Sequence, residues 1–66
     1  MKTIYVNGQQ KQTESENLHQ LLIELEFDVT AIATAIDGNF VPKSLYQTTA
    51  IQQGQKIEVL APMQGG

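Results

Sequence analysis

Hydrophobic and polar positions alternate in three stretches of the chain, residues 2–6, 31–36 and 56–60. A period of two residues is typical of strands that bury one face. Thr34 breaks the alternation of the second stretch, because it is a polar residue on the apolar face. The inward-facing apolar positions of the three stretches are Ile4, Val6, Ile32, Ile36, Ile57 and Val59. We therefore expect three strands that contribute to one core.

Turn signals follow the first two of these strands. Asn7-Gly8 and Asp37-Gly38 are dipeptides that readily adopt the two positive-φ positions of a tight hairpin. Residues 9–13 contain no apolar side chain and are therefore expected to form a weak edge strand. Residues 40–41 begin another short strand, which the proline at position 42 ends. The two hairpins bring the expected number of strands to five.

A single amphipathic helix is predicted between the hairpins. Its apolar stripe has the i, i+3, i+4, i+7 spacing and consists of Leu18, Leu21, Leu22 and Leu25. Asn17 can cap the helix, and Gln20 can complete a capping box. Residues 43–50 have no clean period and are expected to wrap the domain as a turn or one helical turn. One helix and five strands fit an α+β domain of two layers, with a mixed sheet packed against the helix.

Length and composition restrict the class of protein. The 66 residues suffice for one hydrophobic core, but they are too few for a second domain or a deep catalytic cleft. Seven acidic residues against four scattered lysines give a formal net charge of -3, which argues against a nucleic-acid partner. The absence of cysteine excludes a disulfide scaffold. No stretch resembles a signal peptide or a membrane span, so we expect a cytoplasmic protein.

The chain offers no candidate catalytic residue and no candidate metal site. It has no carboxylate pair at a defined spacing, no nucleophile beside a base, and a single histidine, His19. His19 lies off the leucine stripe and is the chain's single histidine, so we assign it no role. The carboxylates are spread along the chain and are expected to be solvated. We therefore expect a substrate of enzymes rather than an enzyme.

The end of the sequence suits chemistry at a C-terminal carboxylate. Pro62 is followed by Met63, Gln64, Gly65 and Gly66. Five extended residues reach about 17 Å, far enough to enter the active site of another protein. The two glycines lack a Cβ, so the backbone can pass a narrow channel and the carboxylate of Gly66 is unhindered. We expect a folded domain over residues 1–61 and a flexible tail over residues 62–66, whose terminal carboxylate can be adenylated.

The sheet face opposite the helix is a candidate docking surface. Alternation places on it four apolar residues that the core does not need: Tyr5, Ala33, Ala35 and Leu60. Single exposed apolar residues are ordinary, whereas a contiguous apolar patch on a small domain tends to mark a partner surface. Whether these residues are contiguous depends on the strand order, which the sequence leaves open.

From the first hairpin to its last residue, the chain resembles the ThiS family of sulfur carriers in thiamin biosynthesis. The segments that carry the resemblance are Ala35-Ile36-Asp37-Gly38-Asn39-Phe40-Val41-Pro42, the turn and strand from Gly54 to Leu60, and Leu60-Ala61-Pro62-Met63-Gln64-Gly65-Gly66. Gln55 departs from the family, which often has aspartate after the turn glycine, and this difference concerns the turn alone. The resemblance implies the ubiquitin-like β-grasp fold.

The resemblance also implies a reaction cycle. In the family, an E1-like adenylyltransferase, ThiF, uses ATP and Mg to adenylate the terminal glycine, which here is Gly66. Sulfur from a cysteine desulfurase or another persulfide donor then displaces AMP and gives a thiocarboxylate. Thiazole synthase, ThiG, accepts that sulfur for thiazole formation. The chain itself is expected to bind no cofactor, to be a monomer when alone, and to insert Gly65, Gln64 and Met63 into the partner's active site.

Three other functions stay open. A ubiquitin-like protein modifier shares the adenylation step but is joined to a lysine of a target protein; the small size and the Pro-Met-Gln-Gly-Gly ending favour a carrier. The small subunit of molybdopterin synthase is also a sulfur donor, but it is generally longer between the second hairpin and the last strand. The third alternative is a plain interaction domain with an inert tail.

Overall fold

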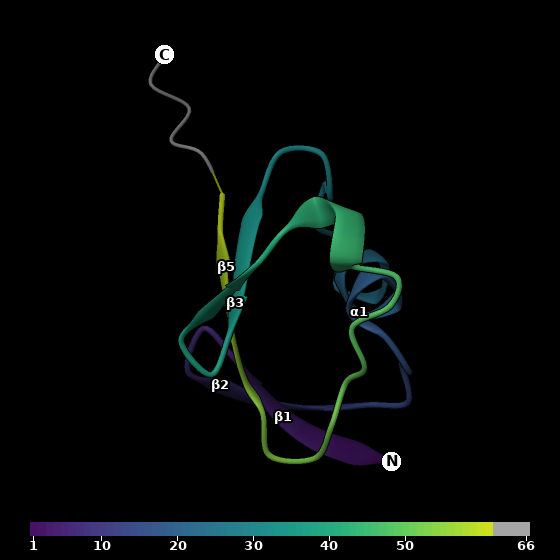
Figure 1. Cartoon of the computed structure of the whole chain (residues 1–66). Helices are drawn as coiled ribbons and strands as arrows, with labels where there is room; N and C mark the ends of the chain where they lie inside the picture. Colours follow the sequence, from purple (N-terminus) through teal and green to yellow (C-terminus); the bar gives the residue numbers. More distant parts are fainter. Residues whose placement is uncertain (62–66) are drawn as a thin grey trace.

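The protein forms two layers, a five-stranded sheet and an α-helix that crosses one of its faces (Figure 1). The structure is a computed structural model that describes residues 1–61. Its elements in chain order are β1 (Lys2–Val6), β2 (Gln9–Thr13), α1 (Leu18–Glu24), β3 (Ala33–Ile36), β4 (Asn39–Val41), the 3₁₀ helix η1 (Lys43–Leu45) and β5 (Lys56–Leu60). The predicted five strands, their order along the chain and the two-layer α+β class are confirmed.

The last strand in sequence is the middle strand of the sheet. The strand order is β2-β1-β5-β3-β4, with β5 parallel to β1 and antiparallel to β3. The hairpin β1-β2 therefore lies on one side of β5 and the hairpin β3-β4 on the other. The predicted weak edge strand, β2, is at the rim of the sheet, as its polar sequence requires.

Both hairpins turn through two residues with positive φ. Asn7 and Gly8 have φ angles of 51° and 83°, and Asp37 and Gly38 have φ angles of 51° and 84°. Such turns match the right-handed twist of the strands they join, which is why Asn-Gly and Asp-Gly are favoured there. The tight turns also set the register of each hairpin, so that Val6 pairs with Gln9 across the first one.

The helix is short and has well-defined caps. The side-chain oxygen of Asn17 accepts a hydrogen bond from the Gln20 N–H (2.8 Å), which confirms the predicted N-cap. The Gln20 side chain accepts a hydrogen bond from the N–H of Glu16 (2.9 Å), one residue before the cap, so the predicted capping box is displaced by one residue. Leu25 follows the last helical residue, and Glu26 ends the helix in the left-handed region with a φ of 66°.

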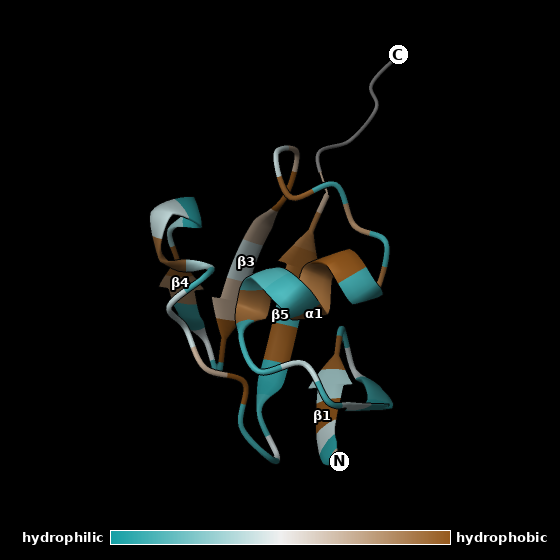
Figure 2. Cartoon of the chain, turned by 90° about the vertical axis from the view of Figure 1, so that its right-hand side faces the viewer, coloured by the Kyte–Doolittle hydropathy of each residue, from teal (hydrophilic) through white to brown (hydrophobic). Residues whose placement is uncertain are grey.

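The core lies between the helix and the inner face of the sheet (Figure 2). It consists of Ile4, Val6, Leu18, Leu21, Leu22, Ile32, Ile36, Val41, Tyr46, Ile51, Ile57 and Val59, with Leu25, Phe27 and Val29 packed against it. The predicted contact between the leucine stripe and the inward strand residues is confirmed. Thr34 is buried among them, and its hydroxyl accepts a hydrogen bond from the Tyr46 hydroxyl (3.1 Å). Within residues 1–61, no helix has the length and apolar character needed to cross a membrane.

Polar side chains join the end of β2 to the last turn of the helix. The hydroxyl of Thr13 donates a hydrogen bond to Glu24 (2.5 Å), and the hydroxyl of Ser15 donates a second one to the same oxygen (2.8 Å). These two donors, Thr13 first, lower the pKa of the Glu24 carboxyl below its ordinary value of 4.5 because they favour the charged form.

The core assignment predicts a large effect of Leu22→Ala. Leu22 has no exposed surface, so its truncation leaves a cavity and should lower the free energy of unfolding by about 2–5 kcal/mol. This is a large part of the stability of so small a domain. The neighbouring Ile23 is 54% exposed, and Ile23→Ala should change stability by about 0.5 kcal/mol or less. Urea unfolding of both variants is the measurement, and equal midpoints would contradict the assignment.

The lowered pKa of Glu24 predicts a pH-dependent contribution to stability. A carboxyl whose folded-state pKa is depressed stabilises the fold above its unfolded-state pKa, and this stabilisation is lost as the pH falls through the folded-state value. Glu24→Gln should therefore be less stable than the original protein at neutral pH, and the difference should disappear in acid below the folded-state pKa of Glu24. Urea unfolding across that pH range is the test. If the difference in the free energy of unfolding between the two proteins does not change with pH, the stabilisation does not depend on the charge of Glu24.

Candidate functional site

The candidate reactive group lies at the far end of the sequence, just after the central strand. Gly66, with Gly65, Gln64 and Met63, is outside the described residues, so their predicted roles stay predictions. The structure does describe how the chain reaches this segment, because β5 ends at Leu60 and is followed by Ala61. The candidate functional site in the described part of the chain is therefore the outer face of the sheet around the end of β5.

Residues of β5 alternate between the core and the outer face, as predicted. Ile57 and Val59 point inward and are buried. Lys56, Glu58 and Leu60 point outward and are exposed, and Leu60 keeps 70% of its surface exposed although it is apolar. Leu60 is thus an exposed apolar side chain at the end of the central strand.

Three of the four residues predicted to form the docking surface lie together. Ala33 pairs directly with Leu60 across β3 and β5, and Ala35 is two residues further along β3, opposite Glu58. Tyr5 lies on β1 and pairs with Lys56 on β5. The central strand therefore separates Tyr5 from the alanines, and on its outer face that strand carries charged Lys56 and Glu58 at this level.

Phe40 joins the three residues and was missed by the sequence analysis. It is 69% exposed and pairs with Ala35 across β3 and β4. The tight turn at Asp37-Gly38 could have revealed it, because a two-residue loop pairs Ile36 with Asn39 and thus places Phe40 beside Ala35. We refer to Ala33, Ala35, Phe40 and Leu60 as the apolar strip.

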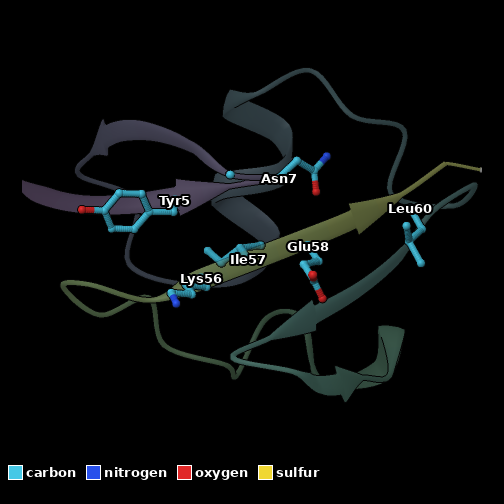
Figure 3. Close-up of a pocket in the computed structure, with 7 residues that line it drawn as sticks. Tyr5, Asn7, Lys56, Ile57, Glu58 and Leu60 are labelled. Atoms are coloured by element: carbon cyan, nitrogen blue, oxygen red, sulfur yellow. The ribbon is translucent and has the colours of Figure 1, made fainter.

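A shallow hollow lies beside the apolar strip, between β1 and β5 (Figure 3). It has a volume of about 710 Å³ and is lined by Tyr5, Asn7, Gly8, Lys56, Ile57, Glu58 and Leu60. Two of the lining residues, Lys56 and Glu58, carry charges of opposite sign, and Leu60 belongs to both the hollow and the apolar strip. Apolar and charged side chains therefore adjoin each other on this part of the outer face.

Asn7 has a second role that its turn motif does not indicate. Its side-chain oxygen accepts a hydrogen bond from the N–H of Val59 (2.8 Å), and its side-chain amide donates one to the carbonyl oxygen of Val59 (3.2 Å). Its main-chain N–H donates to the carbonyl oxygen of Ile57 (2.9 Å). Nothing local in the sequence distinguishes this asparagine from one that only forms a turn, because the bonded residues are 52 positions apart.

Titratable side chains outside the sheet face do not converge on a site. In the part of the chain that the structure describes, no group of three His, Cys, Asp or Glu residues could hold a metal ion. His19 is half-buried and lines a second hollow together with Lys43. Nearby, hydrogen bonds from the hydroxyl and the N–H of Thr30 lower the pKa of Asp28, and the charge of Lys43 adds to this. These are contacts of a local turn.

Comparison with known proteins gives a family and a fold. The family model described as ThiS family matches residues 4–66. A crystal structure of the thiamine biosynthesis protein ThiS from Geobacter metallireducens is 22% identical, covers 97% of this chain and 99% of its own, and has a TM-score of 0.83. An NMR solution structure of a thiamine biosynthesis protein from the same organism is 22% identical, with coverages of 97% and 87% and a TM-score of 0.80. A search of curated proteins found no match. At this identity the structures show the fold alone, which confirms the predicted β-grasp.

Proposed function

The chain belongs to the ThiS family, and from this premise we propose that it is a sulfur carrier of thiamin biosynthesis whose Gly66 carboxylate takes up the sulfur. The observation that carries the proposal is the extent of the family match, which runs from residue 4 to residue 66 and so includes the Gly-Gly end. The β-grasp fold and the small size are consistent with a carrier.

The proposed cycle has three steps. The Gly66 carboxylate attacks the α-phosphate of ATP on an E1-like adenylyltransferase such as ThiF, and pyrophosphate leaves. A persulfide sulfur then attacks the acyl carbon, AMP leaves, and a thiol cleaves the remaining S–S bond to give the thiocarboxylate. Thiazole synthase, ThiG, accepts the sulfur. In this cycle Mg and ATP are bound by the partner, and our chain supplies the reacting carboxylate and its placement.

The outer face of the sheet is suited to dock the partner in this proposal. The apolar strip lies over β3, β4 and β5, so the docking surface adjoins the strand that leads to Gly66. Five residues follow Ala61, with a maximal reach of about 17 Å. A partner that covers Leu60 in this proposal therefore has its reactive centre within about 17 Å of Ala61, and docking limits the positions that the carboxylate can take.

The alternatives differ in what happens after adenylation. A protein modifier is transferred to a lysine, whereas a carrier keeps its own chain and exchanges one oxygen for sulfur. The family match favours the carrier over the modifier and over a small subunit of molybdopterin synthase. Intact-mass measurement after incubation with the adenylating enzyme, Mg-ATP and a persulfide donor separates them. Replacement of one oxygen by sulfur supports our proposal, and attachment to lysines supports a modifier.

Charge placed in the apolar strip should weaken docking without unfolding the protein. We expect Leu60→Asp or Ala35→Arg to raise the Kd for the adenylating enzyme by at least about tenfold, because a charge in a desolvated interface is costly. Ile23→Asp is the matched control, since Ile23 is exposed on α1 in the other layer. Calorimetric titration and circular dichroism are the measurements. If Leu60→Asp binds normally in its native fold, the docking surface lies elsewhere.

Removal of Gly66 should stop adenylation and leave stability unchanged. The change shortens the chain by about 3.5 Å, and the reacting carbon must lie close to the α-phosphate for the reaction to proceed. An added residue should be equally harmful, and Gly66→Ala should slow the reaction because of its Cβ. Pyrophosphate release and thermal unfolding are measured together. The terminal-carboxylate mechanism is wrong if the shortened chain is adenylated as fast as the full one.

A further inference from the structure

The pairing between β1 and β5 ends before β5 does. The register joins Tyr5 to Lys56 and Val6 to Ile57, and β1 ends at Val6. The last three residues of β5 thus have no strand partner on the β1 side. On the other side, β3 continues to pair with β5 as far as Leu60. The end of the central strand therefore needs another partner if both of its edges are to be hydrogen-bonded.

The side chain of Asn7 supplies that partner. Its carboxamide accepts from the N–H of Val59 and donates to the carbonyl oxygen of Val59, so that both main-chain groups of Val59 are hydrogen-bonded although no residue of β1 pairs with it. The φ of 51° at Asn7 belongs to the hairpin turn and orients the side chain toward β5, where Figure 3 shows it beside the strand. The turn residue thus holds β5 two residues beyond Ile57, the last residue that pairs with β1.

Asp37 makes the corresponding contact at the other end of β5. It also has a φ of 51° and is the first residue of a two-residue turn. Its N–H donates to the carbonyl oxygen of Lys56 (2.7 Å), and its side chain accepts from the N–H of Lys56 (2.9 Å). The two hairpins therefore hold β5 from opposite sides, Asp37 at the first residue of the strand and Asn7 at the last but one.

We propose that Asn7 is a positioning residue, whose carboxamide fixes β5 at Val59 and thereby sets the point from which the chain extends toward the partner's active site. The inference rests on the proposed function. Val59 is two residues before Ala61. Without the Asn7 side chain, the N–H and the carbonyl oxygen of Val59 lose their hydrogen bonds, and β3 alone holds the end of β5. The movable segment then begins before Val59 rather than after it. The reacting carbon then spends less time in the productive position.

If Asn7 only stabilised the turn, its substitution would affect the reaction in a different way. Loss of turn stability lowers the amount of folded protein and affects all tail lengths equally. Loss of positioning makes the reaction less sensitive to tail length, because a loosened strand end can compensate for an extra residue. The coupling between Asn7 and tail length therefore distinguishes the two roles.

The experiment compares three proteins, each with its natural tail and with one glycine inserted between Pro62 and Met63. They are the original protein, Asn7→Gly and the matched control Asp37→Gly, in which a turn residue also loses its contact with β5. In the original protein the insertion should lower kcat for pyrophosphate release by at least about a hundredfold. In Asn7→Gly with the natural tail, kcat should fall by about tenfold with little change in KM, and the insertion should have a much smaller further effect. In Asp37→Gly the insertion should lower kcat by the same factor as in the original protein.

Amide hydrogen exchange tests the structural step without the partner. The N–H of Val59 should exchange faster in Asn7→Gly, and that of Lys56 should exchange faster in Asp37→Gly, with the N–H of Ile36 unchanged in both. If Asn7→Gly does not fold, Asn7→Asp replaces it: aspartate tolerates the turn and keeps the acceptor for Val59, but it has no donor for the carbonyl oxygen.

Each outcome decides one proposal. If the glycine insertion lowers kcat by the same factor in all three proteins, Asn7 has no positioning role. An unprotected Val59 N–H in the original protein also overturns it. If the original protein is not adenylated at all, the proposed function fails, whereas the exchange rates still report whether Asn7 fixes the strand end.

Discussion

Two-sided hydrogen bonding of β5 is the constraint on which the rest of the structure depends. The strand pairs with β1 on one side and with β3 on the other, and its inward residues Ile57 and Val59 lie in the core. Neither hairpin alone has a partner for its inner edge. Without β5 the sheet would divide into two ribbons, and two-stranded ribbons are at best marginally stable in water. The helix would then have no continuous surface to cover.

The elements of the fold could be predicted because their signals are local. The alternation in β1 and β5, the leucine stripe of α1 and the two turn dipeptides each occupy a few consecutive residues. The order of strands could not be predicted, since it depends on contacts between residues far apart in sequence. Thr34 illustrates this limit, because its place on the buried face is explained by the hydroxyl of Tyr46, twelve residues away.

Some residues of the candidate site could likewise be predicted from the sequence, and others could not. Leu60 and the two alanines could be placed on the outer face from alternation, and the strand order then showed that they are neighbours. Phe40 could have been included from turn geometry. The contact of Asn7 with Val59 required the structure, because a side chain that substitutes for a strand residue has no periodic pattern. The Gly-Gly end was recognised from composition and resemblance, and its chemistry remains a proposal.

The central position of the last strand has a consequence for synthesis of the protein on the ribosome. The chain leaves the ribosome N-terminus first, so both hairpins and the helix are synthesised before β5. The two hairpins cannot join into one sheet until β5, which ends at Leu60, is available. Contacts between such distant residues form slowly compared with local ones. A product of premature termination before β5 would lack the middle of its sheet and would be open to proteolysis. The outer sheet face that we propose as the docking surface therefore forms only on chains whose synthesis has passed β5.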